Sequence, residues 1–332
     1  MEIGTNSVFT GKIFPSRFYD SYFVNEYGKL ESLRASRYNT CFSIILISVE
    51  RAGKGTPHDD DRGEGFLRKL ASTVADSVRN CDIVGLADDS QILIILPETD
   101  YFGSLTAVRK LTRAVDAIGA GAPLSAIVTQ ATFPKDGRGF GELVGTASKR
   151  VALKRESLWE KLGLKDILFW EIMGRLTATA HSGFNNSCFE AGGDRELTEF
   201  FIDQLDELIV KEISRGPQKR GVLYFSSKKI SQRLPLVKNL NACGAFSTKV
   251  FLVGEPEDNV WEIRTATPLL LDDPRLKETF FTFYLNEGSG YALICKENWG
   301  ATYSCFHTAD PYLVEGLITK FQTEYSLQEQ LG

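Results

Sequence analysis

The sequence predicts an α/β protein of two domains, the first a mixed central sheet flanked by helices. Amphipathic helical stretches alternate with short apolar strands, which is the pattern of α/β folds. The 332 residues exceed one ordinary domain, and a Gly-, Asn- and Ser-rich stretch at 177–195 interrupts the pattern. We therefore expect a first domain at 7–157, a helix and linker at 158–191, and a second, smaller α/β domain at 192–328.

The first domain is expected to begin with a helix at 16–40. Its apolar side chains recur at helical spacing near one face: Tyr19, Phe23, Tyr27, Leu30 and Leu33. Buried strands and amphipathic helices follow in the order of a mixed sheet with packed helices. The predicted elements are strand 41–50, helix 66–80, hairpin strands 83–86 and 91–96, helix 103–119, strand 123–133 and helix 139–163.

The second domain follows a segment at 158–176 that looks helical. Its expected elements are helix 195–214, strand 221–227, a helix in 228–244 interrupted or restarted at Pro235, strands 249–254, 259–266, 278–287, 290–297 and 301–309, and a closing helix at 310–328. This order again predicts an α/β domain.

Composition and charge exclude several classes of protein. The formal net charge is −5, so we expect no bulk attraction to nucleic acid or to an anionic membrane. No apolar run approaches the roughly 18–20 residues that span a bilayer, and the first residues lack the charged start and apolar core of a signal peptide. A cytoplasmic protein is expected.

The cysteines and histidines suggest neither a metal site nor a disulfide framework. Six cysteines are scattered without a C-x-x-C pair, and three histidines lie far apart. We expect buried free thiols in a reducing compartment, and no cofactor or bound metal. The cysteines are Cys41, Cys81, Cys188, Cys243, Cys295 and Cys305.

Six segments of the first domain follow one another in the order of a known family. They are SVFTGKIFPSRFY, LISVE, DDSQI, LIILPET, QATFPKDG and SKRVALKRE. The family has, at the same places, D-x-L-T-G-L-x-N-R-R-x-F, a strand ending in D-x-D, a G-G-D/E-E-F hairpin, a strand with P-E-T, a strand running into Y-P-x-D-G, and a helix like A-L-Y-x-A-K. In this order residues 7–157 resemble a GGDEF domain, the fold of diguanylate cyclases.

The residues on which the cyclase reaction depends do not match. The resemblance implies a carboxylate on the first strand and another on the hairpin, which hold Mg²⁺-GTP. Ser48 stands at the first position, Asp88 and Asp89 replace the hairpin glycines, and Ser90 and Gln91 replace the acidic pair. A neutral hydroxyl cannot supply the missing charge, and carboxylates at the tip would repel a triphosphate. We expect no cyclase activity.

A new metal site at the same place is the alternative interpretation. Glu50, Asp88 and Asp89 would lie near one turn, and three carboxylates are suitable ligands for Mg²⁺. Acidic residues in a hairpin are more often solvated turn formers, and we favour that interpretation.

The stretch RNCD, with Arg79 and Asp82, precedes the hairpin tip by five residues. In GGDEF domains an RxxD at this offset is the inhibitory site for cyclic di-GMP. An Arg fork can bond to guanine O6 and N7 or to phosphate, and an Asp can accept from guanine N–H donors. A surface ion pair without a ligand is the alternative.

A second cation normally completes such a site. In the family it often comes from the helix after the hairpin, where Lys110 matches best, with Arg109 and Arg113 beside it. A Lys ammonium cannot make the bidentate contact of an Arg guanidinium, so Lys110 is expected to give a lower affinity for cyclic di-GMP than an Arg at this position.

Segments of the second domain resemble a DICT domain, a sensory module found with diguanylate cyclases. They are KVFLVGEPED, TPLLLDDPRLKETFFTFYL, GYALICKEN and YSCFHTADPYLVEGL. The resemblance implies a sensory or binding role for a ligand that it does not identify.

Together these features predict a bacterial second-messenger receptor. It would bind cyclic di-GMP at Arg79 and Asp82 and signal through its second domain or an unidentified protein partner; homodimer formation stays open. One alternative is a nucleotide-free scaffold that uses the GGDEF fold as a dimerisation or partner surface. Another is a pocket that holds GTP without turnover.

Overall fold

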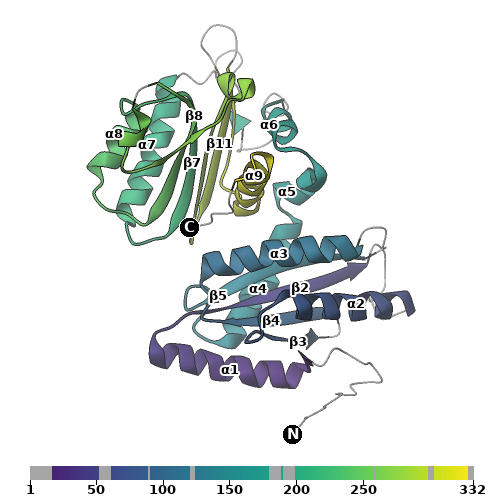
Figure 1. Cartoon of the computed structure of the whole chain (residues 1–332). Helices are drawn as coiled ribbons and strands as arrows, with labels where there is room; N and C mark the ends of the chain where they lie inside the picture. Colours follow the sequence, from purple (N-terminus) through teal and green to yellow (C-terminus); the bar gives the residue numbers. More distant parts are fainter. Residues whose placement is uncertain are drawn as a thin grey trace. The chain divides into compact units, whose positions relative to one another are not determined.

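The computed structural model describes residues 17–51, 61–88, 90–119, 124–178, 188–189, 199–257, 259–297 and 303–327. The chain forms two compact units, Met1–Glu156 and Ser157–Gly332 (Figure 1). The first unit ends within one residue of the predicted boundary.

Unit 1 contains a five-stranded sheet in the order β1-β3-β4-β2-β5. The short β1 pairs in parallel with β3, and the other neighbouring strands are antiparallel. The sheet is therefore mixed, as predicted. Its elements are β1 (Phe18–Tyr19), α1 (Ser21–Tyr38), β2 (Phe42–Arg51), α2 (Asp61–Ser77), β3 (Ile83–Asp88), β4 (Gln91–Pro97), α3 (Tyr101–Gly119), β5 (Leu124–Phe133) and α4 (Phe140–Arg155).

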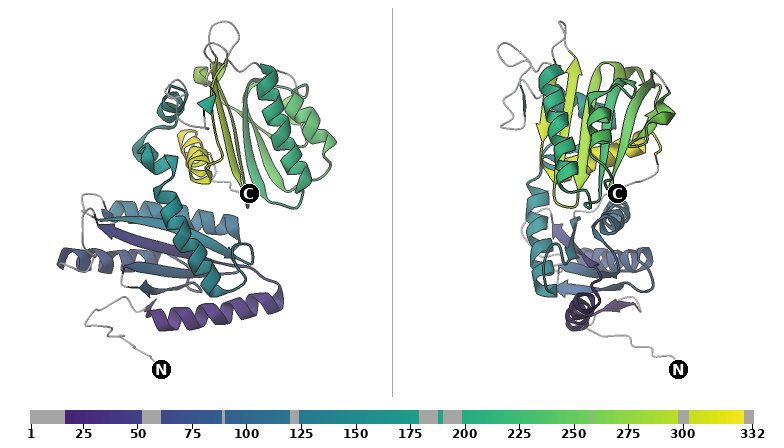
Figure 2. Two further views of the ribbon diagram at one scale, coloured as in Figure 1. Left: turned by 180° about the vertical axis from the view of Figure 1, so that it is seen from behind. Right: turned by 90° about the vertical axis from the view of Figure 1, so that its left-hand side faces the viewer.

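Helices cover both faces of this sheet (Figure 2). Side chains of α2 and α3, such as Leu70 and Leu111, pack with Ile45 and Ile94 on one face. Side chains of α1 and α4 pack with alternate residues of β2 and β4 on the other face. Because successive strand residues point to opposite faces, the near-continuous apolar run of β2 serves both cores.

Helix α1 does not bury the apolar face that the sequence pattern indicates. Phe23 is 40% exposed, Leu30 64% and Leu33 69%, whereas Val24, Gly28 and other small or polar residues face inward. A Cβ at Gly28 would overlap the ring of Phe140 on α4. The close approach of the two helices selects the small residues for burial and leaves the larger ones outside.

Unit 2 contains a seven-stranded sheet in the order β6-β12-β11-β10-β7-β8-β9. Strands β7, β8 and β9 are parallel neighbours, and the other neighbouring strands are antiparallel. Its elements are α5 (Leu158–Lys161), α6 (Phe169–Ala178), β6 (Cys188–Phe189), α7 (Glu199–Arg215), β7 (Gly221–Ile230), α8 (Pro235–Ala242), β8 (Thr248–Pro256), β9 (Thr267–Leu270), β10 (Thr279–Asn286), β11 (Gly290–Glu297), β12 (Tyr303–Thr308) and α9 (Pro311–Glu324), with 3-10 turns at Leu164–Asp166, Val260–Glu262 and Pro274–Lys277.

The two faces of this sheet have different cores. Helices α7 and α8 pack with Leu223, Leu252 and Tyr284 on one face. On the other face Phe169 of α6 and Phe321 of α9 make edge and tilted ring contacts with each other and with Phe281. Aromatic packing of this kind adds to the area-based burial energy.

The structure corrects three expectations about unit 2. The helical segment expected at 158–176 is present as α5 and α6, but it does not stand between the units, because α6 contributes the buried Phe169 to the core of unit 2. With them unit 2 spans more residues than unit 1, so it is not the smaller. The segment 259–266 is not a strand but holds a 3-10 turn at Val260–Glu262.

Two cysteines differ from the expectation of free thiols. Cys295 on β11 and Cys305 on β12 lie directly opposite each other and are joined in a disulfide. Strand register brings them together, which sequence spacing does not reveal. Among the described residues, no helix combines the length and apolar character needed to cross a membrane.

Candidate functional site

The turn between α2 and β3 contains Arg79 and Asp82. The backbone N–H of Arg79 donates to Asp82 Oδ2 at 2.7 Å, and the N–H of Asp82 donates to the Arg79 carbonyl at 3.1 Å. The Asp82 side chain is 6% exposed. Its carboxylate therefore fixes the turn, as short acidic side chains commonly do.

Three basic residues gather around this turn. Arg79 itself is exposed. Arg17 donates from Nη2 to the Arg79 carbonyl at 2.6 Å and from Nη1 to Asn80 Oδ1 at 3.0 Å. Lys110 Nζ donates to the Ser77 carbonyl at 2.6 Å, just before the turn. The result is a concentration of positive charge at one loop, which suits an anionic ligand.

Of the three basic residues predicted on α3, two share an exposed side of the helix. Lys110 and Arg113 are both exposed and are three positions apart, so they lie on neighbouring turns of one face. Arg109 is 5% exposed and lies on the buried side of α3. The structure thus brings Lys110 to the turn and places Arg109 away from the surface.

Arg17 is the residue that sequence reasoning missed. It precedes β1, and the parallel pairing of Phe18 with Val84 carries it to the start of β3. A separation of 62 residues along the chain gives no local signal for this contact. Only strand pairing reveals it.

The hairpin tip lies at the other end of β3, about 20 Å away at ~3.3 Å per strand residue. Ser48 pairs with Gln91 across β2 and β4, and the N–H of Val49 donates to the Ser90 carbonyl at 3.0 Å. Ser48 and the hairpin tip are therefore adjacent. Ser48 is 8% exposed and offers a neutral hydroxyl there.

The Asp88 carboxylate is used within the tip itself. Its Oδ1 accepts from the backbone N–H of Ser90 at 2.8 Å and from the Ser90 hydroxyl at 3.1 Å. Asp89 lies outside the described residues, as does the side chain of Glu50. Across the described part of the chain, no three His, Cys, Asp or Glu side chains form a group that could hold a metal ion.

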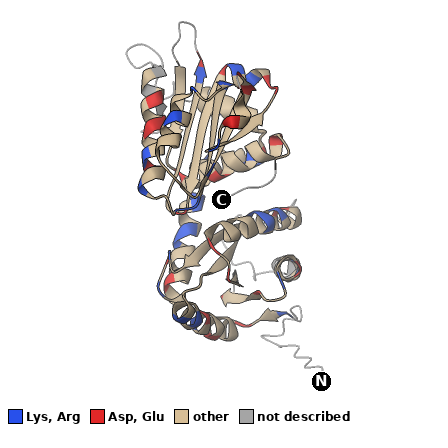
Figure 3. Ribbon diagram, turned by 60° about the vertical axis from the view of Figure 1, so that its left-hand side comes forward, with Lys and Arg blue, Asp and Glu red and all other residues tan. Residues whose placement is uncertain are grey.

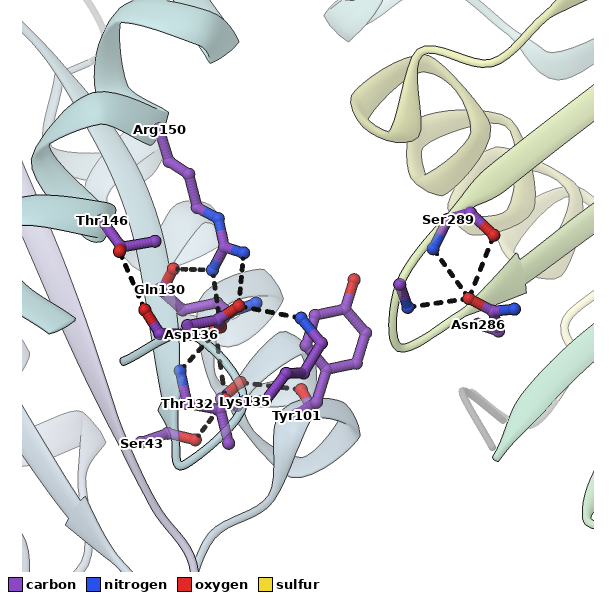
Figure 4. Close-up of polar contacts among 12 residues, drawn as sticks. Ser43, Tyr101, Gln130, Thr132, Lys135, Asp136, Thr146, Arg150, Asn286 and Ser289 are labelled. Carbon is purple, nitrogen blue, oxygen red and sulfur yellow. Dashed lines mark hydrogen bonds and ion pairs between the residues drawn. The ribbon is translucent and has the colours of Figure 1, made fainter. Parts of the chain in front are cut away.

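An ion pair orders the turn that follows β5, at the same end of the sheet as Arg79 (Figure 4). Both Arg150 nitrogens Nη1 and Nη2 bond to the Asp136 carboxylate at 2.8 Å, and the N–H of Thr132 donates to Asp136 Oδ2 at 2.9 Å. Burial opposes ionisation of Asp136, but the bonds from Arg150 and Lys135 outweigh it, so the pKa of Asp136 lies below its ordinary value.

Comparisons with known proteins give structural likenesses only. No protein-family model matches the chain, and no curated protein does. The chain is similar to the diguanylate cyclase SiaD from Pseudomonas aeruginosa, solved in complex with its activator SiaC, at 17% identity and a TM-score of 0.37. That match covers 41% of this chain and 54% of SiaD, so it spans about half of that protein.

Two further solved structures have similar values. A diguanylate cyclase from Thermotoga maritima matches at 16% identity and a TM-score of 0.35, over 40% of this chain and 95% of that one. The GGDEF domain of DgcB from Caulobacter crescentus, in complex with c-di-GMP, matches at 10% identity and a TM-score of 0.37, over 42% and 84%. These matched structures are GGDEF diguanylate cyclases or GGDEF domains, and each match covers about two fifths of this chain.

Proposed function

We propose that unit 1 is a noncatalytic GGDEF-like domain that binds cyclic di-GMP at the Arg79–Asp82 turn and signals through unit 2 or a protein partner. The observation that carries this proposal is the gathering of Arg17, Arg79 and Lys110 around one ordered turn. Cyclic di-GMP carries two phosphates and two guanines. A site for it therefore needs positive charge for the phosphates and a planar guanidinium that can bond to a guanine or a phosphate through two N–H groups.

Arg79 is the residue suited to recognise the base or phosphate. Its guanidinium is exposed, and an Arg fork can bond in a bidentate manner to guanine O6 and N7 or to a phosphate. Asp82 holds the backbone from which this side chain projects. Lys110 and Arg113 would supply charge for the phosphates from the neighbouring helix.

The hairpin end supports the absence of cyclase activity in this proposal. Ser48 brings no charge to the position beside the tip, and the Asp88 carboxylate is engaged by Ser90. Phosphoryl transfer depends above all on metal coordination and substrate positioning. A neutral hydroxyl and a self-bonded turn supply neither.

The test is isothermal titration of the full chain with cyclic di-GMP. Arg79→Ala should weaken binding by about 1–3 kcal/mol, which is roughly fivefold to more than a hundredfold. Arg138→Ala is the matched control, because Arg138 is another exposed arginine of unit 1, in the turn after the opposite edge strand β5. Its affinity should equal that of the wild type.

Two results would contradict the proposal. One is unchanged affinity in Arg79→Ala, and the other is no heat of binding from the wild type at micromolar protein. GTP with Mg²⁺, titrated in parallel, should be silent; saturable GTP binding would favour the alternative of a pocket that holds GTP without turnover.

The exposed face of α1 favours the scaffold as a second candidate. Tyr22 is 76% exposed, and Leu30 and Leu33 lie on the same helix with more than half of their surface in solvent. Leu30 and Leu33 are three positions apart and so are neighbours on the helix surface, and neighbouring exposed apolar side chains are typical of interaction surfaces. If a second copy covers this face, sedimentation velocity should show a dimer that Leu30→Glu with Leu33→Glu converts to monomer without added nucleotide.

A further inference from the structure

Unit 2 contains a cavity of about 530 Å³ between α7 and the sheet. It lies over β7, β10 and β11 and is closed on one side by the start of α8, where Leu234 and Leu236 line it. Volumes of roughly 300–1,000 Å³ are typical of sites for small organic molecules. The cavity belongs to unit 2 alone, so nothing in this inference depends on the cyclic di-GMP proposal.

A little more than half of the residues that line the cavity are apolar or aromatic. Leu293 and Cys295 on β11 are fully buried, and Leu236 on α8 is 3% exposed. Phe280 and Tyr303 stand edge to face at 5.9 Å between ring centroids. Together with Phe225 they form a surface against which a flat or aliphatic ligand body can pack.

One carboxyl group is buried in this apolar wall. Asp206, on α7, is 6% exposed, and its Oδ1 accepts from the Thr282 hydroxyl at 2.9 Å. Burial raises the pKa of Asp206 to about 7; the bond from Thr282 opposes this rise, and the charge of Asp203 adds to it. A buried carboxylate is costly unless a cation or several hydrogen bonds compensate it.

The other charged residues that line the cavity are partly or fully exposed. On α7, Asp203 is exposed and Glu207 pairs with Lys211 at 2.8 Å. On β7, Lys228 and Lys229 are exposed, and Lys228 pairs with Glu297 at 2.6 Å while lying over the Phe280 ring. Figure 3 colours the Lys and Arg residues and the Asp and Glu residues along the ribbon. Asp206 is therefore the buried charged residue of the lining, which also contains the polar residues Ser226, Ser227, Asn239 and Thr282.

We propose that this cavity binds a small organic amine, whose ammonium group pairs with Asp206 and whose apolar body packs against Phe225, Phe280 and Leu293. An amine supplies the positive charge and the N–H donors that the buried carboxylate lacks. An anionic ligand would meet Asp206 with like charge. A neutral ligand would bury the apolar walls but leave the carboxylate uncompensated.

The test uses three probes that share one indole ring and differ in charge: tryptamine, tryptophol and indole-3-acetate. Each is titrated into the full chain at pH 8. Tryptamine should bind at least tenfold more tightly than tryptophol, and indole-3-acetate most weakly. Asp206→Asn keeps the size of the side chain and the acceptor for Thr282, and it should abolish the preference for tryptamine.

Glu212→Gln is the matched control, since Glu212 is a partly exposed acid of α7 that pairs with Lys219 and does not line the cavity. It should leave the preference intact. Equal affinity for the three probes, binding of none, or a preference that survives in Asp206→Asn would each overturn the proposal.

Titrations at pH 6 of a chain that retains Asp206 keep the test decisive if Asp206→Asn does not fold. Asp203 and Glu207 on the same helix, and Lys228 and Lys229 on β7, line the cavity with Asp206, and Tyr291 on β11 interacts with it electrostatically. None of these ordinarily changes charge between pH 8 and 6. His307 on β12, whose Nδ1 lies 3.3 Å from the Tyr291 hydroxyl, does, so these titrations are made in a His307→Gln background. Tryptamine affinity should fall severalfold at pH 6 while tryptophol affinity stays constant; an unchanged tryptamine affinity would overturn the proposal.

Discussion

The two ends of the unit 1 sheet use acidic residues in different ways. At one end Asp82 and Asp136 each have a side chain only 6% exposed, and each accepts a backbone N–H that orders a turn. Arg17 and Lys110 donate to backbone carbonyls in and just before the Asp82 turn, and Lys135 and Arg150 donate to the Asp136 carboxylate itself. At the other end Asp88 is exposed and bonded to Ser90, and Ser48 is neutral. The difference teaches that the chain orders cations at one end and has no comparable arrangement, in its described residues, at the other.

The largest expected effect is on folding at the ordered end. Asp136→Ala should lower the free energy of unfolding by about 2–3 kcal/mol, because it leaves Arg150 without its carboxylate in a partly buried position. Urea denaturation measures this. Asp88→Ala at the opposite end is the control and should cost under about 1 kcal/mol, since Asp88 is exposed. Equal losses in the two variants would remove the contrast between the ends.

The same ion pair should make stability depend on pH. The pKa of Asp136 in the folded chain lies below that in the unfolded chain, so its contribution is complete above about pH 4 and is lost as pH falls through the folded value. Urea midpoints of the wild type and Asp136→Asn should therefore converge between pH 6 and pH 3. A gap that stays constant over this range would show that the charge of Asp136 contributes nothing.

A smaller effect should follow removal of Arg17. Arg17→Ala deletes two donors that hold the Arg79–Asn80 backbone, and it should weaken cyclic di-GMP binding by about 1 kcal/mol, or roughly fivefold. Calorimetric titration measures this, with Arg37→Ala, an exposed arginine of α1, as control. If Arg17→Ala binds as tightly as the control, the turn does not need this contact.

The smallest effect is expected at the hairpin end. Ser48→Ala should leave cyclic di-GMP affinity unchanged and shift the free energy of unfolding by no more than about 1 kcal/mol, because one hydroxyl is lost and little volume changes. The same titration and urea experiments measure both quantities. A clear loss of affinity would place the ligand at the hairpin end and reverse the comparison.

Local patterns were sufficient for much of the fold. The hairpin strands, helix α3 and the strand that became β2 follow from apolar periodicity and turn residues, which act over a few neighbours. The segment 259–266 shows the limit of that method. Its aromatic and β-branched residues favour a strand, but the chain forms a turn at Val260–Glu262 and places the edge strand β9 after it.

The candidate site was only partly predictable for the same reason. The RxxD turn and Lys110 could be named from sequence, because the resemblance gives their offsets. Arg17 could not, since it reaches the turn through strand pairing across 62 residues. The burial of Arg109 was also invisible, because neighbouring helix positions differ in exposure according to what packs against them.

The sequence by itself determined the two α/β units, the position of the RxxD stretch directly before the first hairpin strand, and the neutral side chain of Ser48. These properties depend on residue type and on short spacing. Tertiary structure decided which face of α1 is buried, that α6 belongs to unit 2, that Cys295 meets Cys305, and that Asp206 lies in a cavity. Each of these depends on strand register or helix packing between residues far apart in the chain, and such contacts leave no local pattern.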